Sequence, residues 1–473
     1  MSYHTSAPTS PPETEADQAR SSVEPLALKT IFVTWWPLAA SWLLMAVELP
    51  MVSAVMARLP APEISLAAWG GVIFPIALLI ESPIIMLLAA STALSKDWAN
   101  YRKVRRFMMW AGGGLTVLHV AVAFTPLYDF VVGQILGAPP EILGPARIGL
   151  QLMTPWTWSI AFRRFHQGVL IRYGHSEAVG IGTAIRLTTD ATILGAGLLI
   201  GDIRGIVVAG SAVGLGVIAE AVYAGLRARP VVRDEVRTSE PADEVLTLRS
   251  FLEFYIPLAL TSLLTLLTQP IGSAALSRMP DPLASLAVWP VVNGLVFMSR
   301  SLGVAYNEVV VALLDRARSY RSLQRFTLIL GAGTSAFLLI IALTPLSDFW
   351  FRVVSGLPPR LAPLGTSALL YALPMPGLVV LHSWFQGGLV NQRKTRGVTE
   401  SVGLALIVSA LVLLVGVITK PMPGLYVVWI ALDAGALVQM LWLWWRSRSA
   451  MKRIREEDRP GPEHTQAAEE SGA

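Results

Sequence analysis

The chain of 473 residues contains no cysteine. Disulfide bonds, thiolate metal sites and cysteine nucleophiles are therefore excluded. Charged residues are also scarce, since they make up 15% of the sequence against 53% for hydrophobic residues, and the mean hydropathy is +0.56. This balance lies outside the usual range of soluble globular proteins and indicates a membrane protein without a large soluble domain.

Motifs of several enzyme classes are absent as well. The sequence has neither a G-x-x-x-x-G-K-[ST] loop for nucleotide phosphates nor an H-E-x-x-H metal-binding helix, and its six histidines are isolated from one another. We therefore expect neither an enzyme nor a direct ATP-driven pump. No cofactor, no metal and no nucleic-acid partner is expected.

Apolar runs of about 20 residues or more, enough to cross a bilayer as helix, recur along the chain. The predicted fold is all-α and polytopic, with twelve transmembrane helices. The predicted spans are residues 30–56, 65–95, 106–131, 144–171, 177–200, 206–226, 251–276, 285–314, 326–350, 361–391, 398–418 and 423–445.

These spans fall into two six-helix lobes with polar segments around them. The predicted divisions are a disordered cytoplasmic tail at 1–28, a first lobe at 29–226, a charged linker at 227–250, a second lobe at 251–446 and a second cytoplasmic tail at 447–473.

The two lobes are copies of an internal repeat. The stretch LPMVSAVMARLPAPEISLAAW matches QPIGSAALSRMPDPLASLAVW at an offset of 220 residues, and FTPLYDFVVGQILGAPP matches LTPLSDFWFRVVSGLPP at an offset of 219 after one deletion. Matched pairs include Pro37 with Pro257, Pro50 with Pro270, Arg58 with Arg278, Trp69 with Trp289, Gly137 with Gly356 and Gln167 with Gln386. Because each copy has an even number of spans, both enter the membrane from the same side, which predicts two parallel repeats around a central cleft.

Basic residues are distributed unevenly between the two sides of the membrane. With the N-terminus inside, the inner loops hold clusters such as the run at 102–106, whereas the outer loops hold single residues such as Arg58 and Arg278. This asymmetry predicts a multi-pass protein of the plasma or inner membrane with both termini in the cytoplasm.

Ionisable residues inside the spans are functional candidates, because a charge at mid-bilayer costs about 2.5 to 3.5 kcal/mol even on insertion scales. The candidates are Glu48, Glu81, Arg163, Arg164, Arg186, Asp190, Glu220, Arg300, Glu308, Asp433, His119, His166 and His382. Arg186 and Asp190 are four residues apart, so they are predicted either to neutralise each other on one helix face or to serve transport. Glu220 and Asp433 are interpreted as structural or interfacial carboxylates.

Several of these residues are assigned to a substrate cleft or gate: Glu81, Arg300, Arg163, Arg164, Arg186, Glu308 and His382. Glu81 maps onto Ser301, next to Arg300, so the two charges either pair across the cleft as a gate or pair within their own lobes. Arg163 maps onto His382. The basic groups at this depth either bind an anionic substrate or extend to the cytoplasmic interface.

The segment WLLMAVELPMVSAV combines a shared feature with a feature of one lobe. Pro50 recurs as Pro270 and is interpreted as a shared kink or helix break in both copies. Thr268 stands opposite Glu48, so the acid belongs to the first lobe alone. A carboxyl group inside the membrane can carry a proton, so Glu48 and Asp190 are the predicted ion-coupling residues.

Twelve spans in two parallel repeats, with no nucleotide-binding domain, resemble the superfamily of the multidrug and toxic compound extrusion (MATE) transporters and the flippases of lipid-linked oligosaccharides. In addition, PLALTSLLTLLTQPIGSAALSR at 257–278 and the position of Glu48 resemble the progressive ankylosis family. The first resemblance implies export of cationic drugs coupled to protons or sodium. The second implies export of small anions such as pyrophosphate, citrate or nucleotides.

The predicted function is therefore secondary active transport: an antiporter that exports small organic solutes by alternating access of the two lobes. Its expected partners are a small-molecule substrate, a coupling ion (proton or sodium) and the lipid bilayer, and it is expected to be a monomer. The alternatives are a flippase for a lipid-linked precursor, which would need a strongly basic cavity, and a membrane scaffold or receptor.

Overall fold

The computed structural model describes residues 26–241, 246–316, 318–392 and 396–458, and all regular structure in these ranges is helical. The first lobe contains α2 (Leu28–Met56), α3 (Pro62–Ala68), η1 (Trp69–Ile73), α4 (Phe74–Ile85), α5 (Leu87–Leu94), α6 (Trp98–Phe124), η2 (Asp129–Ile135), α7 (Pro140–Leu152), α8 (Thr154–Arg172), α9 (Glu177–Ile200), α10 (Gly205–Val231) and η3 (Val232–Val236). The second contains α11 (Leu248–Leu276), α12 (Pro282–Leu313), α13 (Tyr320–Leu343), α14 (Leu346–Asp348), η4 (Phe349–Val354), α15 (Ala362–Tyr371), α16 (Pro374–Asn391), α17 (Arg396–Thr419) and α18 (Gly424–Glu457).

Eleven helical segments among the described residues are long and apolar enough to cross a membrane. The twelfth predicted span, 144–171, corresponds to α7 and α8 and is absent from that set. Its sequence explains this, because α8 carries Arg163, Arg164, His166 and Gln167 within five positions of one another. These polar residues lower its hydropathy, and the helix is mostly buried inside the lobe instead of facing lipid.

The helices extend beyond two of the predicted boundaries. α10 continues to Val231 and is followed by η3, within the expected linker, and α18 continues past residue 446 to Glu457. Met451 explains the second extension, because it is 5% exposed and packs against Gly388 of α16. The parts of the predicted tails at 1–25 and 459–473 lie outside the described residues.

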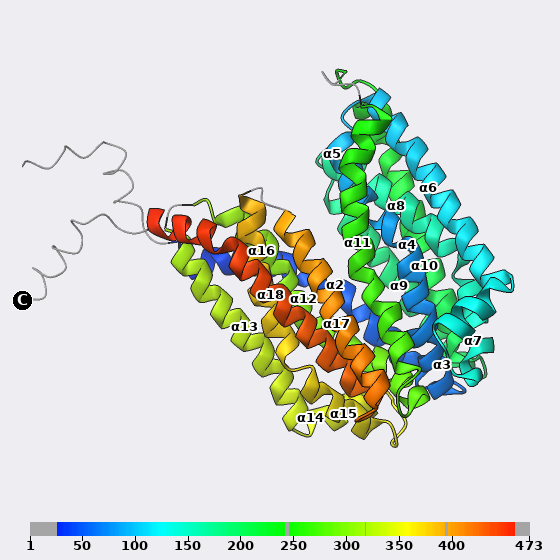
Figure 1. The fold of residues 1–473 in the computed structure, drawn as a ribbon. Coiled ribbons are helices and arrows are strands. Elements are labelled where there is room, and N and C mark those ends of the chain that lie inside the picture. Colours follow the sequence, from blue (N-terminus) through cyan, green and yellow to red (C-terminus); the bar gives the residue numbers. More distant parts are fainter. Residues whose placement is uncertain (1–25, 242–245, 317, 393–395, 459–473) are drawn as a thin grey trace, which may run out of the picture.

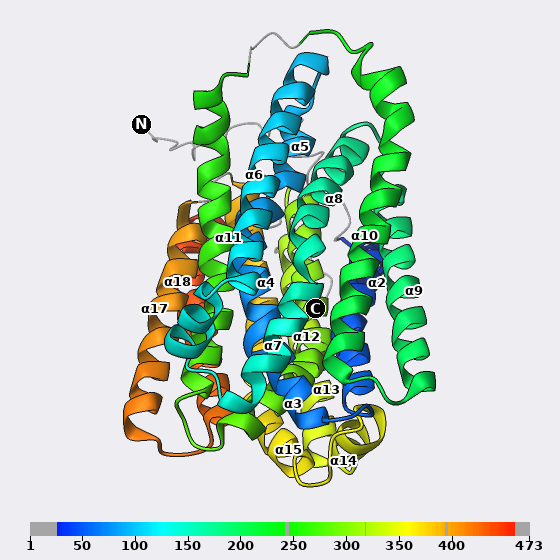
Figure 2. The ribbon, with the colours of Figure 1, turned by 90° about the vertical axis from the view of Figure 1, so that its right-hand side faces the viewer.

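The two lobes form a V (Figure 1). They meet at the end that carries α3, α7, α14 and α15, here called the closed end, and diverge toward the end that carries α5 and the last turns of α18, here called the open end. α10 ends and α11 begins at the open end (Figure 2). Both copies of the repeat therefore run in the same direction, as the sequence predicts.

The first helix of each lobe packs along the other lobe, α2 along α12 and α11 along α4. Each of these two helices also forms a hydrogen bond to the opposite lobe. Trp35 Nε1 of α2 donates to the carbonyl of Leu302 at 3.0 Å, and the Tyr255 hydroxyl of α11 donates to the carbonyl of Pro83 at 2.5 Å. α2 and α11 thus join the two lobes by contacts that are related by the repeat.

The π-helix η1 explains why the repeat changes offset. Trp69 and Trp289 are 220 residues apart, whereas Ser82 and Ser301, which both bond to the carbonyl three residues earlier, are 219 apart. A π-helical turn accommodates one extra residue, and η1 lies between these two points in the first copy only. The expected match of Glu81 with Ser301 is therefore wrong, and Glu81 corresponds to Arg300 itself.

Close packing joins the parts of the two lobes that lie nearest the closed end. A Cβ on Gly70 of η1 would lie 2.6 Å from the Pro290 ring, and one on Gly294 would lie 3.1 Å from Pro50. Pro50 thus fits against a glycine of α12, and neither it nor Pro270 interrupts its helix. Of the two interpretations of these prolines, the helix break is not formed, because α2 and α11 are continuous, and the kink stays a prediction.

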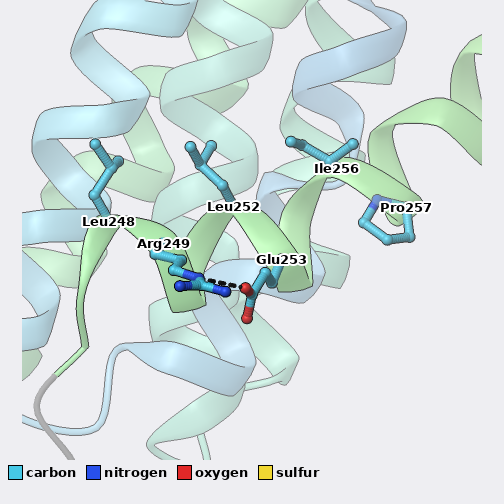
Figure 3. A pocket seen from close by; sticks show the side chains of 6 residues that line it. All are labelled: Leu248, Arg249, Leu252, Glu253, Ile256 and Pro257. Atoms are coloured by element: carbon cyan, nitrogen blue, oxygen red, sulfur yellow. Dashed lines mark hydrogen bonds and ion pairs between the residues drawn. The ribbon is translucent and has the colours of Figure 1, made fainter.

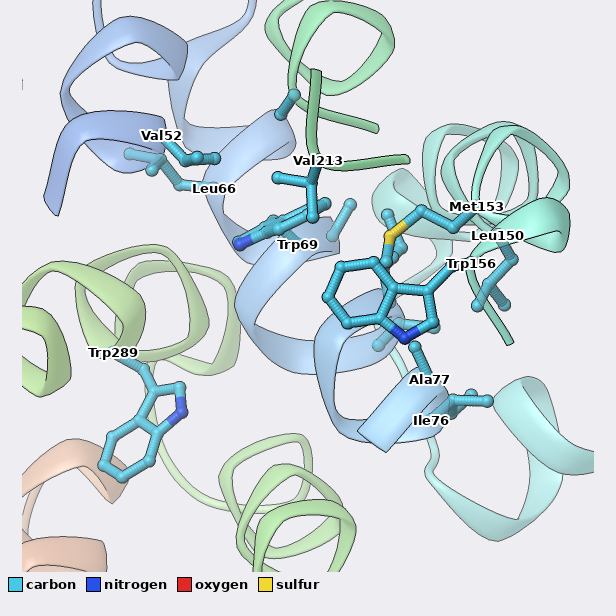
Figure 4. Close-up of a cluster of buried hydrophobic side chains, with 14 of the residues drawn as sticks. Val52, Leu66, Trp69, Ile76, Ala77, Leu150, Met153, Trp156, Val213 and Trp289 are labelled. Carbon is cyan, nitrogen blue, oxygen red and sulfur yellow. The ribbon is translucent and has the colours of Figure 1, made fainter. Parts of the chain in front are cut away.

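The core of the first lobe surrounds Trp69 and Trp156 (Figure 4). Trp69 is 1% exposed and lies beside Val213 of α10, while its counterpart Trp289 packs against Trp429 of α18 at a ring separation of 5.2 Å. The matched tryptophans therefore occupy equivalent cores in the two lobes.

Candidate functional site

A cluster of charged side chains lies inside the first lobe where α2, α8, α9 and α10 meet. Arg186 of α9 bridges two acids, with its Nη2 2.8 Å from Oε2 of Glu48 and its Nε 3.7 Å from Oε2 of Glu220. Arg163 of α8 donates a hydrogen bond to the same Glu220 oxygen, and Gln167 Nε2 donates to Oε1 at 2.9 Å. The Glu220 side chain is 0% exposed, so these partners replace its water shell.

Asp190 is the acid of this cluster without a cationic partner. Neither of its buried carboxylate oxygens receives a hydrogen bond from any described residue, and the Glu48 carboxylate is a neighbouring negative charge. Two like charges this close repel each other, so a proton on Asp190 would remove the repulsion. The expected pairing of Asp190 with Arg186 is not formed, because Arg186 is engaged by Glu48 and Glu220.

Local sequence explains how these groups come together. Arg163 and Gln167 are four residues apart and share one face of α8, as do Arg186 and Asp190 on α9. A glycine makes room for Asp190: a Cβ on Gly216 of α10 would lie 1.9 Å from its Oδ1. The backbone of α10 therefore packs directly against the carboxylate.

The equivalent place in the second lobe has the same packing without the charges. A Cβ on Gly435 would lie 2.2 Å from Ser409 Oγ, and this pair matches Gly216 and Asp190 at the offset of 219. The residues that stand opposite the charged members of the cluster are Thr268, His382, Ala405, Ser409 and Gln439. The cluster is thus a chemical specialisation of one lobe on a shared scaffold.

Glu220 is the residue that sequence reasoning placed least well. We interpreted it as a structural or interfacial carboxylate, whereas its side chain contacts Arg163, Gln167 and Arg186 at the centre of the cluster. Its depth on α10 alone gave no indication of these partners. The signal that could have found it is the excess of basic residues on α8, which need buried acids nearby.

The proposed gate between Glu81 and Arg300 is not formed in this conformation. Glu81 is 3% exposed and accepts a hydrogen bond from the indole of Trp156 within its own lobe. Arg300 instead lies over the Phe297 ring at 5.0 Å, and its buried Nε has no partner among the described residues. Each residue therefore stays within its own lobe here.

The remaining predicted cleft residues are dispersed. Arg164 Nε and His382 Nε2 are buried and have no hydrogen-bond partner among the described residues. Glu308 is exposed and lies near Trp42 of α2. Arg164, Arg300 and His382 are consequently basic groups whose hydrogen-bonding capacity is not fully used inside the protein.

Two arginines that the sequence placed as isolated outer residues join the lobes at the closed end. Arg58, after α2, bonds through Nη2 to the carbonyls of Val353 at 2.5 Å and Val354 at 3.0 Å, which end η4 of the second lobe. Arg278, after α11, bonds to the carbonyls of Gln134, Ile135 and Leu136, at the end of η2 of the first lobe and directly after it, at 3.1, 2.8 and 2.6 Å.

These two contacts, here called the arginine clasps, are related by the repeat. Val353 and Val354 match Gln134 and Ile135 at an offset of 219, and each arginine also bonds the carbonyl four residues before it at 2.7 Å. Gly137 and Gly356, with φ of +67° and +68°, lie directly against the guanidinium groups. The identity of Arg58 and Arg278 in the two copies was the signal for this role.

Two surface hollows have fewer charged side chains than the cluster. One follows α11 and is lined by that helix alone, with Arg249 and Glu253 paired at 2.8 Å (Figure 3). The other is an apolar groove of about 500 Å³ between α2 and α9, lined by residues that include Val47, Met51 and Leu187. The groove lies beside the cluster, since Glu48 and Arg186 are the sequence neighbours of two of these residues.

Comparison with solved structures identifies the architecture. A multidrug resistance MATE family transporter of the MOP superfamily in an inward-facing conformation matches with a TM-score of 0.65 and 14% identity, over 87% of this chain and 96% of that chain. The lipid II flippase MurJ in an inward closed conformation matches with a TM-score of 0.64 and 11% identity, over 90% of each chain. The chain has the fold of these transporters.

This likeness confirms the prediction of an all-α fold with two lobes of six helices, and of a multi-pass membrane protein. It also confirms the resemblance to the MATE and flippase group, whereas the closer resemblance to the progressive ankylosis family stays a prediction. An outward-facing MATE family structure matches with a TM-score of 0.57 and 15% identity, over 94% of this chain and 99% of that chain, below the value for the inward-facing one. No protein-family model and no curated protein matches the sequence.

Replacement of Gly216 by Ala tests the packing of Asp190. The new methyl group would occupy the position of Oδ1, so the carboxylate or α10 must move. We expect a loss of stability of about 1 to 3 kcal/mol, together with loss of gradient-driven transport, measured by thermal unfolding and in proteoliposomes. Gly435→Ala is the control, because its methyl group would meet only uncharged groups, the Ser409 hydroxyl and the carbonyl of Ala405. It should lower stability to a similar extent and leave coupling intact.

Proposed function

We propose that the protein is a secondary active transporter that exports a small solute by alternating access and uses a proton gradient. The observation that carries this proposal is the buried cluster of the first lobe. It contains three carboxylates (Glu48, Asp190 and Glu220) and two guanidinium groups (Arg163 and Arg186), so with every group ionised its formal charge is −1. A single proton makes the cluster neutral, and the pair of Asp190 and Glu48 is the proposed binding site for this proton.

A change of protonation at this pair has a direct route to the other lobe. Glu48 lies on α2, which packs along α12, and Asp190 lies on α9 of the first lobe. When Glu48 or Asp190 binds a proton, the attraction between Glu48 and Arg186 changes, and Arg186 has Glu220 as its second acid. We propose that α2 then shifts against α9 and changes the angle between the lobes.

The orientation is part of the same proposal. Clusters of basic residues mark the open end, so by the positive-inside rule this end faces the cytoplasm, together with both termini. The arginine clasps then close the outer side in an inward-facing state. We place the protein in the plasma or inner membrane as a monomer.

For the substrate we propose a small organic anion. Arg163 and Arg186 are neutralised by acids, but Arg164, Arg300 and His382 each present a buried nitrogen without a partner among the described residues. Guanidinium groups bind carboxylate and phosphate through paired hydrogen bonds. The resemblance of residues 257–278 to the progressive ankylosis family supports the same class, which includes pyrophosphate, citrate and nucleotides.

A flippase is the second candidate, and the groove between α2 and α9 favours it. This apolar groove of about 500 Å³ gives a lipid tail a place next to the charged cluster, as a lipid-linked substrate would require. The groove lacks a strongly basic lining, so we rank the flippase second.

Transport in proteoliposomes tests the proposal. Pyrophosphate, citrate and a cationic dye are compared under imposed proton and sodium gradients, with a fluorescent lipid-linked precursor in a separate assay. We expect proton-driven movement of an anion. Movement of the dye alone would remove the anion proposal, and movement of only the lipid-linked compound would replace the exporter by a flippase.

A further inference from the structure

A further cavity, separate from the two surface hollows and from the charged cluster, lies between α6, α8 and α10 of the first lobe and has a volume of about 780 Å³. Four arginines line it: Arg102, Arg105, Arg229 and Arg237. No acidic residue is among its lining residues. We call it the basic pocket.

The arginines of the basic pocket have unused hydrogen-bonding capacity. All four are exposed, and none of their side chains forms an ion pair or hydrogen bond with another described residue. Arg237 lies over the Trp98 ring at 4.6 Å, which holds its guanidinium group at the mouth of the pocket. A concentration of unpaired cations of this kind attracts and binds an anion.

The pocket changes from basic to apolar along the helices. Arg102 and Arg105 lie in the first turns of α6 and Arg229 near the end of α10, so all three are at the open end. Farther from that end, apolar side chains dominate the lining, and only Ser159 and His166 are polar there; the apolar ones include Trp158, Phe162, Ile218, Val222 and Leu226. Val222 and Leu226 are 54% and 51% exposed and face the region where lipid tails would lie.

We propose that the basic pocket binds the phosphate headgroup of an anionic phospholipid, with the start of an acyl chain on the apolar part. A soluble phosphate compound would use the arginines but not the apolar wall, whereas a lipid uses both. Basic pockets between transmembrane helices on the cytoplasmic side are suited to such headgroups.

The bound lipid would stabilise the scaffold of the charged cluster. The floor of the pocket includes Phe162 and His166 of α8, the helix that holds Arg163 and Gln167 on Glu220. Phe162 fits against Gly225 of α10, where a Cβ would lie 2.6 Å from its ring. A headgroup that bridges α6 and α10 would therefore hold both helices against α8.

Native mass spectrometry and thermal unfolding of the purified protein test the proposal, with phosphatidylglycerol and cardiolipin compared with phosphatidylcholine. The wild type should retain the anionic lipids and gain thermal stability from them. Arg102→Gln/Arg105→Gln should weaken this binding by roughly thirtyfold, from about a factor of five for each arginine near an anionic surface. Arg229→Gln/Arg237→Gln, which changes other helices of the same pocket, should have the same effect.

The matched control is Arg321→Gln/Arg325→Gln, which removes two exposed arginines from α13, the counterpart of α6. It should leave lipid binding unchanged. Equal loss in control and pocket variants would overturn the site. Displacement of the lipid by inorganic phosphate or pyrophosphate at similar concentration would show a site for soluble anions and overturn the lipid proposal. Neither readout depends on transport.

Discussion

Asp190→Asn is expected to reduce proton-driven accumulation of substrate to the level of protein-free liposomes. The amide keeps the size of the carboxyl group and its place against Gly216, but it cannot bind and release a proton. It also removes one negative charge, so the cluster becomes permanently neutral. Exchange of substrate down its own gradient should persist, because that process requires no change of protonation. Both fluxes are measured with the same proteoliposomes.

The control is Asp433→Asn in the second lobe. Asp433 is also a membrane carboxylate with a buried oxygen that lacks a partner among the described residues, but no arginine cluster surrounds it. Coupling should survive this change. If Asp433→Asn abolished accumulation and Asp190→Asn did not, the coupling site would lie in the other lobe. Glu48→Gln should resemble Asp190→Asn, since it removes the negative charge next to Asp190 and the acid that pairs with Arg186.

Loss of the arginine clasps is expected to open the closed end. Arg58 and Arg278 together make five hydrogen bonds to carbonyls of the opposite lobe. Each arginine should contribute about 1.5 kcal/mol to the closed arrangement, roughly tenfold in the conformational equilibrium. Arg58→Ala/Arg278→Ala should therefore shift the population strongly toward opening at this end.

The absence of native cysteine makes this measurement direct. Spin labels at Glu141→Cys and Thr419→Cys, on opposite lobes at the closed end, should report a longer distance in the double variant. Arg352→Ala is the control, because Arg352 pairs at 2.6 Å with Asp348 of its own lobe. An unchanged label distance in the double variant, or an equal change with Arg352→Ala, would show that the clasps do not hold the lobes together.

Much of the fold follows from hydropathy and internal symmetry. The spans and the parallel repeat are visible because prolines and glycines recur in register, as with Gly137 and Gly356. The π-helical turn η1 was not predictable in detail, because one inserted residue between Trp69 and Ser82 is absorbed without breaking the helix. That single residue moved the predicted partner of Glu81 by one position.

The members of the site were predictable, but their pairing was not. Glu48, Asp190, Arg163 and Arg186 stand out because charge is rare in these spans. Helical spacing suggested a pair of Arg186 with Asp190, yet tertiary packing brings Glu48 and Glu220 to Arg186 instead. Contacts between α2, α9 and α10 cannot be read from the spacing along any one helix. Only the folded chain shows which acid has no arginine partner.

The most direct test of the account is the pH dependence of lobe opening, which requires no knowledge of the substrate. Spin labels at Thr238→Cys and Arg448→Cys, on opposite lobes at the open end, report the angle between the lobes in a bilayer. We expect the distance distribution of the wild type to change between mildly acidic and mildly alkaline pH, and Asp190→Asn to remove this change. A pH response that is the same in wild type and Asp190→Asn, or absent from the wild type, would contradict it.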